Sequence, residues 1–346
     1  MKSNRIISYR QIIAPLIFMF FCATLAGCRY ETDSIAPEKT SYAASQEDSE
    51  TSDSLESLKI PPEFENYAEN QSPVWMAGMW VEHLNCSEMK EADLQVFEMK
   101  DSVVRIRVLL QNGLEKKQPY YFMILADGLP VQFTVEEEKR NYYPVELDRT
   151  VAFEAEYEAV FEMDSGRVDY LFFYDGDPVS EFHSLCQTAV FKNHTAKAAA
   201  DKNNIETVPL RSGLRSLFGE GSVRSWLSPK EVLGNPDYME THQRYQLGED
   251  DELVLEAVMA KEGRYRTVMI CGHEWHEIKS ESSSYDYIDW EASSGRMLQL
   301  PVCIPEGRGK PYSCFTIHTP IEPARLNEAP YISGKTEIFE TGESNE

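Results

Sequence analysis

The chain has 346 residues, of which 58 are Asp or Glu and 33 are Lys or Arg, so its formal charge at pH 7 is −25. A protein this acidic does not bind nucleic acid through general electrostatics, because its field repels the phosphate backbone. Hydrophobic residues make up 42% of the chain and aromatic residues 11%. This composition and length favour roughly two folded domains with apolar cores.

The beginning of the chain has the pattern of an export signal. Lys2, Arg5 and Arg10 precede residues 12–27, which carry no charge. A positively charged start followed by an apolar segment is typical of a signal peptide. The apolar segment is shorter than the roughly 20 residues that a membrane-spanning helix needs. Residues 1–27 are therefore predicted to be removed on export.

Residues 25–28, Leu-Ala-Gly-Cys, resemble the lipobox of bacterial lipoproteins. The resemblance covers residues 1–28 and implies cleavage between Gly27 and Cys28, followed by a covalent diacylglycerol on the Cys28 thiol. The lipid would hold the mature chain on the extracytoplasmic face of a cell membrane or an outer membrane. No other cofactor is predicted. An uncleaved anchor or an ordinary signal peptide is the alternative reading of this segment.

Residues 28–72 are rich in Ser, Thr, Glu and Asp and poor in apolar side chains. Such a segment cannot bury enough apolar surface to offset the entropy lost on ordering. We therefore expect a disordered tether that separates the folded part from the membrane.

Residues 73–193 have the pattern of an antiparallel β-sandwich of the immunoglobulin-like type. Along residues 150–163, one face is apolar and the other acidic: Val151, Phe153, Ala155, Tyr157, Ala159 and Phe161 alternate with Glu154, Glu156 and Glu158. A period of two places one face of a strand on a core and the other in water. Asp127-Gly128, between two apolar runs, predicts a tight hairpin. Further strands are expected in residues 102–111, 119–135, 167–177 and 183–191.

A polar linker is expected over residues 194–208, followed by a second β-rich domain over residues 209–326 and a disordered tail over residues 327–346. The second domain carries one helix signature: Ser228 as N-cap, Pro229 at the first position, Glu231 completing a capping box and Gly234 at the end. Its strands are expected in residues 251–260, 264–275, 285–292, 296–305 and 313–320. The predicted fold class is thus mainly all-β, with two sandwich-like domains.

Five cysteines follow Cys28 in the sequence: Cys86, Cys186, Cys271, Cys303 and Cys314. Outside the cytosol disulfides are permitted, and an odd number leaves at least one thiol unpaired. Two pairings are considered, Cys86 with Cys186 and Cys303 with Cys314. Reduced, buried cysteines are the alternative.

Residues 271–277, Cys-Gly-His-Glu-Trp-His-Glu, concentrate groups that can bind a metal ion. Cys271, His273 and His276 are the candidate ligands, but on a straight strand they do not all share one face, and metal binding requires ligands that converge. A strand with ordinary polar residues is the alternative.

Residues 285–290 place aromatic rings beside carboxylates, a combination suited to contact with a sugar. The candidate ligand patch comprises Tyr285, Asp286, Tyr287, Asp289 and Trp290. Strands also bury Tyr and Trp routinely in their cores, so core packing is the competing interpretation.

The sequence contains no nucleophile elbow, phosphate-binding loop or dinucleotide fingerprint. We therefore expect a lipid-anchored, non-enzymatic binding or scaffolding protein of the cell surface, whose partner is an extracellular protein or a glycan. One alternative is an envelope hydrolase that uses carboxylates or a metal ion near residues 271–276. Another is an accessory or immunity-type lipoprotein of a membrane complex.

Overall fold

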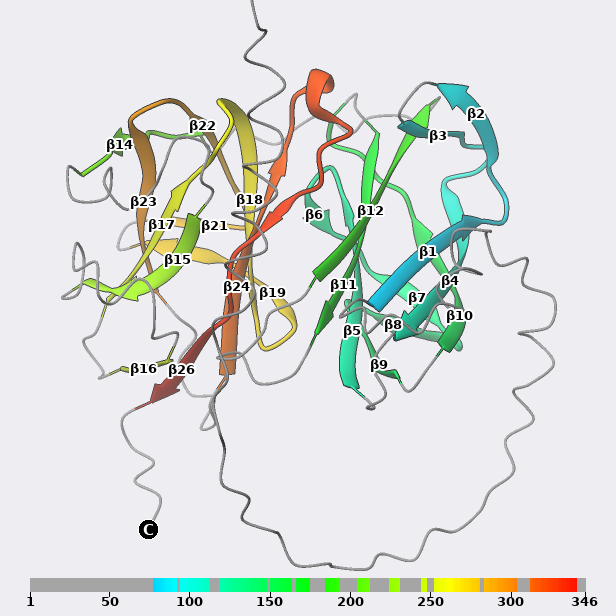
Figure 1. The fold of residues 1–346 in the computed structure, drawn as a ribbon, viewed down its shortest axis with the longest axis horizontal. Helices are drawn as coiled ribbons and strands as arrows, with labels where there is room; N and C mark the ends of the chain where they lie inside the picture. The colour runs from blue at the N-terminus through cyan, green and yellow to red at the C-terminus, as the bar shows by residue number, and fades with distance from the viewer. Residues whose placement is uncertain are drawn as a thin grey trace, which may run out of the picture. The chain divides into compact units, whose positions relative to one another are not determined.

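The computed structural model describes residues 77–91, 94–112, 118–147, 150–163, 166–174, 184–192, 204–211, 224–230, 244–247, 252–280, 283–303 and 312–340 (Figure 1). The expected signal peptide, Cys28 and the expected tether lie outside these residues. Within them the fold is all-β, as the sequence predicts. No helix of the described segments is both long enough and apolar enough to cross a bilayer.

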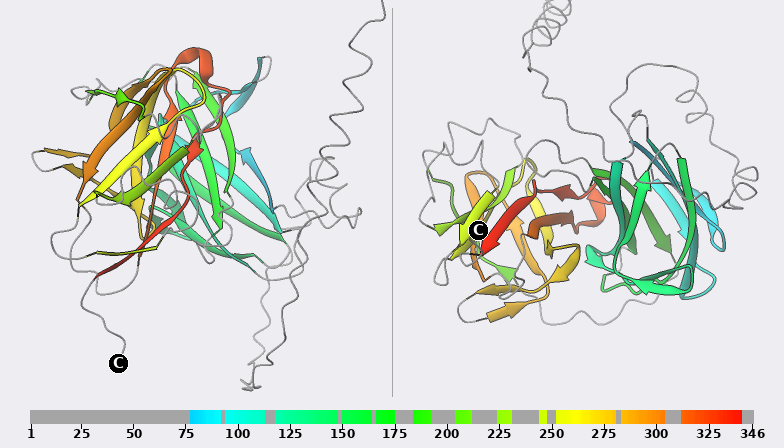
Figure 2. Two further views of the ribbon diagram at one scale, coloured as in Figure 1. Left: turned by 60° about the vertical axis from the view of Figure 1, so that its left-hand side comes forward. Right: turned by 90° about the horizontal axis from the view of Figure 1, so that it is seen from below.

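The N-terminal sandwich, residues 77–192, consists of two facing sheets (Figure 2). The first sheet has the order β1 (Ala77–His83), β4 (Val103–Asn112), β10 (Thr150–Glu158), β7 (Phe133–Val135) and β8 (Glu138–Arg140). The second has the order β2 (Ser87–Glu91), β3 (Leu94–Glu98), β12 (Ser184–Lys192), β11 (Arg167–Tyr174), β5 (Gln118–Ala126) and β6 (Leu129–Pro130), with β9 (Tyr143–Leu147) also paired to β5. Neighbouring strands are antiparallel except β3 and β12.

The core of this sandwich confirms the alternation seen in the sequence. The predicted apolar face of residues 150–163 packs into one cluster with side chains of β4, β5 and β11, while Glu154, Glu156 and Glu158 are exposed. The Asp127-Gly128 hairpin is also confirmed, because it joins β5 to β6 with positive φ angles of 47° and 79°. Both angles are those of the two-residue turn that suits the twist of a hairpin.

The C-terminal sandwich, residues 204–340, is built from one eight-stranded sheet and one four-stranded sheet. One has the order β13 (Asn204–Ile205), β22 (Ile288–Ala292), β18 (Gly263–Cys271), β24 (Tyr312–Pro320), β26 (Thr336–Glu340) and β16 (Arg244–Leu247), with β19 (Glu274–His276) beside β18 and β25 (Tyr331–Ile332) beside β24. The other has the order β14 (Val208–Pro209), β23 (Arg296–Val302), β17 (Leu253–Val258) and β15 (Arg224–Pro229). A small hairpin, β20 (Ile278–Ser280) and β21 (Ser283–Tyr285), and a 3-10 turn, η2 (Pro323–Arg325), complete it.

Three sequence-based boundaries of this region are wrong where the structure describes them. Ser228 and Pro229, expected to begin a helix, are the last residues of strand β15, because Ser228 pairs with Val254 of β17; Glu231 and Gly234 lie outside the described residues. Residues 204–208, expected in the linker, supply β13 and the first residue of β14. The expected disordered tail contributes β25 and β26, which pair with β24.

The two sandwiches share a third apolar cluster, here called the junction core. It joins Tyr121, Met123, Leu125, Leu171 and Phe173 of β5 and β11 to Val268, Ile270, Tyr287, Phe315 and Ile317 of the C-terminal sandwich. Strands β5 and β11 are therefore buried on both faces, since their alternate residues belong to the core of the N-terminal sandwich. This arrangement explains why their sequences are continuous apolar runs rather than alternating ones.

Gly128 shows how closely the two sandwiches approach. A methyl group at this position would lie 2.9 Å from the Thr319 Cβ atom of β24, which is closer than two carbon atoms can come without displacement. The glycine in the hairpin therefore serves two needs, the positive φ angle and the contact with the neighbouring sandwich.

Candidate functional site

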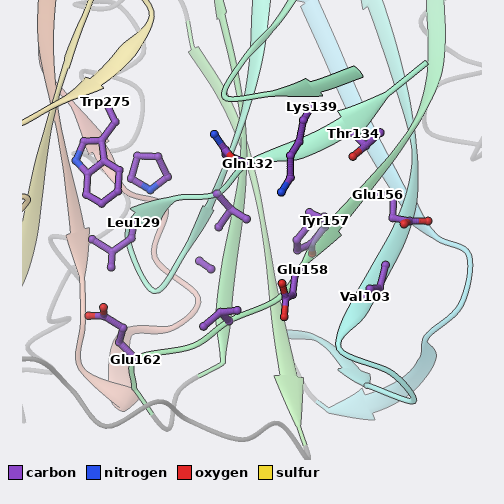
Figure 3. A pocket seen from close by; sticks show the side chains of 14 residues that line it. Val103, Leu129, Gln132, Thr134, Lys139, Glu156, Tyr157, Glu158, Glu162 and Trp275 are labelled. Atoms are coloured by element: carbon purple, nitrogen blue, oxygen red, sulfur yellow. The ribbon is translucent and has the colours of Figure 1, made fainter. Parts of the chain in front are cut away.

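A cleft with a volume of about 480 Å³ lies between β10, the β5–β6 hairpin, β7, β8 and Trp275 of β19. We call it the junction cleft, because residues of both sandwiches line it. Its lining is Val103, Ala126, Leu129, Pro130, Val131, Gln132, Thr134, Lys139, Glu156, Tyr157, Glu158, Val160, Glu162 and Trp275. In Figure 3, Trp275, Leu129 and Glu162 lie toward one end and Thr134, Glu156 and Val103 toward the other. A volume of this size matches pockets that take small ligands.

Trp275 reaches the cleft because residues 271–277 fold back as a tight hairpin. Gly272 and His273 form the turn with φ angles of 57° and 71°, and Trp275 then pairs with Ile270 of β18. The indole is 37% exposed, which is unusual for so large an apolar side chain. Its Nε1 donates a hydrogen bond of 2.9 Å to the backbone oxygen of Asp286. The ring is thus held by its polar edge while part of its surface stays open.

The acidic face of β10 is paired across the sheet with arginines of β4. The register places Glu154 opposite Arg107 and Glu156 opposite Arg105, and both pairs form salt bridges, of 2.7 Å and 3.0 Å. Glu158, two residues further along, lies opposite Val103. At the cleft, therefore, Glu156 is held by a cation and Glu158 stands beside an apolar neighbour.

Glu162, a residue of the N-terminal sandwich, lines the cleft and is bound by side chains of the C-terminal sandwich. Its carboxylate accepts hydrogen bonds from Arg266 Nη1 at 3.3 Å and from the Tyr287 hydroxyl at 3.2 Å. Arg266 also forms a buried salt bridge with Asp289 at 2.9 Å, and its guanidinium lies over the Tyr287 ring at 4.1 Å. These contacts fix the Glu162 carboxylate in position and neutralise part of its charge.

The predicted ligand patch is divided by this arrangement. Tyr287, Asp289 and Trp290 are buried, so they are not available to a ligand, and the Trp290 ring packs in the core of the C-terminal sandwich. Asp286 is exposed and Tyr285 half-buried. The patch thus supports the junction cleft from behind, through Tyr287, Asp289 and the backbone of Asp286, rather than forming a binding surface itself.

The predicted metal ligands do not converge. Cys271 is bonded to Cys314, so its thiolate is not available to an ion. His273 packs against the rings of Tyr121 and Tyr142 in the N-terminal sandwich, with centroid distances of 4.6 Å and 5.0 Å. Among the described residues, no group of three or more His, Cys, Asp or Glu side chains has the geometry to hold a metal ion.

Both considered disulfide pairings are wrong, because the observed bond joins Cys271 to Cys314. These residues are direct partners in the antiparallel pair β18–β24, and both are fully buried. Cys86, Cys186 and Cys303 are free thiols. The reason is the strand order: β18 and β24 are neighbours in one sheet, and this long-range pairing is not visible in the sequence.

Two buried arginines join the sandwiches around the cleft. Arg167, which is 1% exposed, forms a two-pronged salt bridge with Asp169 at 2.8 Å and 2.9 Å. It also donates to backbone oxygens of the other sandwich, those of Pro320, Arg325 and Glu328. In the opposite direction, Arg266 donates to the backbone oxygen of Asp127 at 3.3 Å. Each sandwich therefore satisfies polar groups of the other.

A serine and a histidine of the C-terminal sandwich stand in the geometry of a nucleophile and its base. The Ser225 Oγ and His318 Nε2 atoms are 2.7 Å apart, and His318 Nδ1 is 2.7 Å from the Thr267 hydroxyl. His318 is fully buried, and burial lowers its pKa from 6.5 to about 3. A substrate cannot reach this pair, and the third group is a hydroxyl rather than a carboxylate. We conclude that this is a satisfied polar core.

Sequence reasoning missed Trp275 and the cleft residues of β6 and β7. A sequence signal for Trp275 did exist, because it lies in the segment singled out for metal binding. The convergence of Gln132, Thr134 and Lys139 with Trp275 has no sequence signature, since it depends on how the sandwiches meet.

No family model matches the chain, and a search of curated proteins finds no relative. Among solved structures, the chain is similar to the YadV chaperone (8% identity over 69% of this chain and 92% of that chain, TM-score 0.21). It is also similar to a CsuC–CsuE chaperone–tip adhesion subunit complex of Acinetobacter baumannii (10% identity, 77% and 99%, TM-score 0.18). A third such structure is CBD12 from CALX1.2 (7% identity, 70% and 95%, TM-score 0.18). Scores this low transfer no ligand or activity, so the all-β class rests on the strands themselves.

Proposed function

We propose that this chain is a lipid-anchored binding protein that acts outside the bacterial cytoplasm and takes its ligand in the junction cleft. The observation that carries the binding role is the cleft itself, which is lined from both sandwiches and has an exposed, anchored indole at one end. The anchor rests on the resemblance of residues 25–28 to a lipobox. The buried disulfide Cys271–Cys314 is consistent with an oxidising compartment.

The arrangement supports binding more than catalysis. Carboxylates in the cleft are held by salt bridges, as Glu156 is by Arg105 and Glu162 by Arg266. Paired carboxylates of this kind are suited to accept hydrogen bonds from a ligand in a fixed geometry. The one serine–histidine pair described above is closed to substrates.

The anchor is tested by replacing Cys28 with alanine in the host cell. We expect the wild-type chain to incorporate radiolabelled fatty acid and to sediment with membranes, whereas Cys28→Ala should accumulate as unprocessed precursor without label. Label in the Cys28→Ala protein, or recovery of wild-type protein from cytosol with Met1 intact, would contradict the proposal.

The binding role is tested by a thermal-shift screen of the purified full-length Cys28→Ala protein. The screen uses simple sugars and oligosaccharides, polyamines, basic peptides and divalent metal ions. We expect a compound that raises the melting temperature of this protein but not of the same protein carrying Trp275→Ala. A compound that is bound and also converted to product, as followed by chromatography, would identify an envelope hydrolase instead. The absence of any Trp275-dependent shift would refute a binding role for the cleft.

A further inference from the structure

The charge around the junction cleft is partly balanced by residues behind its lining. The lining itself is acidic, like the whole chain, because it carries three glutamates and one lysine. When the salt-bridge partners Arg105, Arg266 and Asp289 are included, four carboxylates face three cations. The cleft is therefore close to electrically neutral within a strongly acidic protein. A site that selected a multivalent cation would leave most of its carboxylates without basic partners, whereas here Glu156 and Glu162 are paired with arginines and only Glu158 lies beside an apolar residue.

The lining instead combines an apolar floor with hydrogen-bonding groups of both kinds. Gln132, Thr134 and Lys139 can donate, and Glu156, Glu158 and Glu162 can accept. Figure 3 shows Lys139 and Glu158 between the two ends of the cleft. Glu162 is held by the buried Arg266, and Glu158, which is exposed, is the carboxylate that is accessible to a ligand.

Trp275 adds a flat apolar surface beside these groups. Its indole nitrogen is occupied by the backbone oxygen of Asp286, so the exposed part of the ring offers π surface rather than a free donor. Pyranose rings have one face of C–H groups and an edge of hydroxyls. They therefore fit a site with an aromatic platform on one side and polar side chains around it.

On this basis, and resting on the proposed function, we infer that the junction cleft binds a neutral carbohydrate, with one sugar ring stacked on Trp275 and its hydroxyls bonded to Gln132, Thr134, Glu158 and Lys139. The ligand class is an uncharged mono- or oligosaccharide segment. Lysine-rich protein segments and polyamines are the competing class, because they too combine an apolar stem with polar ends.

The test is a calorimetric titration of the full-length Cys28→Ala protein with two panels. The first contains neutral sugars: glucose, galactose, mannose, xylose, N-acetylglucosamine and their oligomers. The second contains spermidine and a lysine-rich peptide. We expect a neutral sugar to bind with an affinity in the millimolar to micromolar range, or about −4 to −8 kcal/mol. Its affinity should change by less than about two-fold between low and high salt, since an uncharged ligand is not screened.

Substitutions in the cleft distinguish binding of a carbohydrate from binding of a cation. Trp275→Ala should weaken sugar binding at least about ten-fold, the loss of one stacked ring, while Trp275→Phe should retain part of it. Glu158→Gln should keep most of the affinity, because an amide still accepts a hydrogen bond, and Glu158→Ala should lose it. The matched control is Glu154→Gln, an exposed glutamate on the same face of β10 that does not line the cleft; it should bind as the parent does.

The outcomes are distinguishable. One outcome is that spermidine or the peptide binds instead, in a way that depends on Trp275 and is weakened by salt and by Glu158→Gln. That result would refute the carbohydrate as the ligand class but would leave the proposed binding function intact. Sugar binding that is unchanged in Trp275→Ala would overturn the inference by placing the sugar elsewhere. No binding from either panel would overturn the inference, and the wider thermal-shift screen then decides the proposed function.

Discussion

Replacing Arg167 with methionine should destabilise the protein far more than removing any surface ion pair. The guanidinium is 1% exposed and its partner Asp169 is fully buried. Without Arg167, the Asp169 carboxylate would keep hydrogen bonds from Thr188 and Cys186 but would have lost its buried cation. Breaking a buried pair in this way costs about 3–5 kcal/mol. Backbone oxygens of Pro320, Arg325 and Glu328 would also lose a donor, at about 1 kcal/mol or more each.

The assay is urea unfolding at pH 7, followed by circular dichroism and by tryptophan fluorescence on the same samples. We expect Arg167→Met to lose at least about 3 kcal/mol, a large share of the 5–15 kcal/mol typical of a folded protein. Arg105→Met provides the matched control, because the Arg105–Glu156 pair is 65% and 48% exposed; it should lose about 1 kcal/mol or less. The double variant Arg167→Met/Asp169→Leu should be more stable than Arg167→Met alone. Equal losses in Arg167→Met and Arg105→Met would refute the argument that the junction depends on this arginine.

Further predictions concern the disulfide and two histidines, the half-buried His83 and the fully buried His318. Replacing both Cys271 and Cys314 with alanine should reduce the free energy of unfolding by about 4 kcal/mol, the loop-closure value for a sequence separation of 43; unchanged denaturation midpoints under oxidising conditions would contradict this. Burial lowers the pKa values of His83 and His318 from 6.5 to about 3, so between these values the unfolded chain binds more protons than the native one, and stability should fall as pH decreases below 6.5. In that window each histidine contributes about 1.4 kcal/mol of unfolding free energy per pH unit. The variant His318→Gln should therefore show a smaller dependence of unfolding free energy on pH between about pH 6.5 and 5, a range in which most carboxylates do not yet titrate. An identical slope in this variant would show that His318 is already hydrated in the native state.

Local sequence patterns predicted the strands well, because alternation and turn signals depend on residues that are near one another in the sequence. The alternation around Phe153 and Tyr157 and the Asp127-Gly128 turn could be recognised from period and turn chemistry alone. The expected helix start at Ser228 shows the limit of local reasoning. Ser228 and Pro229 still pair with β17 in the sheet, and helical geometry appears only at Lys230, because tertiary context routinely outweighs propensity.

The candidate site was predictable only in part, because it is made by contacts between distant segments. The segment around Cys271 was predicted as a metal site and instead carries a disulfide and supplies Trp275 to the cleft. Its cysteine partner on β24 and its tight turn follow from sheet order. Asp289 was expected on a ligand surface and is instead buried against Arg266. A carboxylate next to aromatic residues has the same sequence pattern in either setting, and only the position of the arginine distinguishes them.

The burial of β5 and β11 on both faces has a consequence for how this protein can be divided. A fragment that ended near residue 193 would expose Tyr121, Met123 and Phe173 to solvent, and an apolar patch of that kind promotes aggregation. Neither sandwich is therefore expected to fold as an independent domain, and truncation or recombination between them should yield insoluble fragments. The two sandwiches are therefore expected to be inherited together.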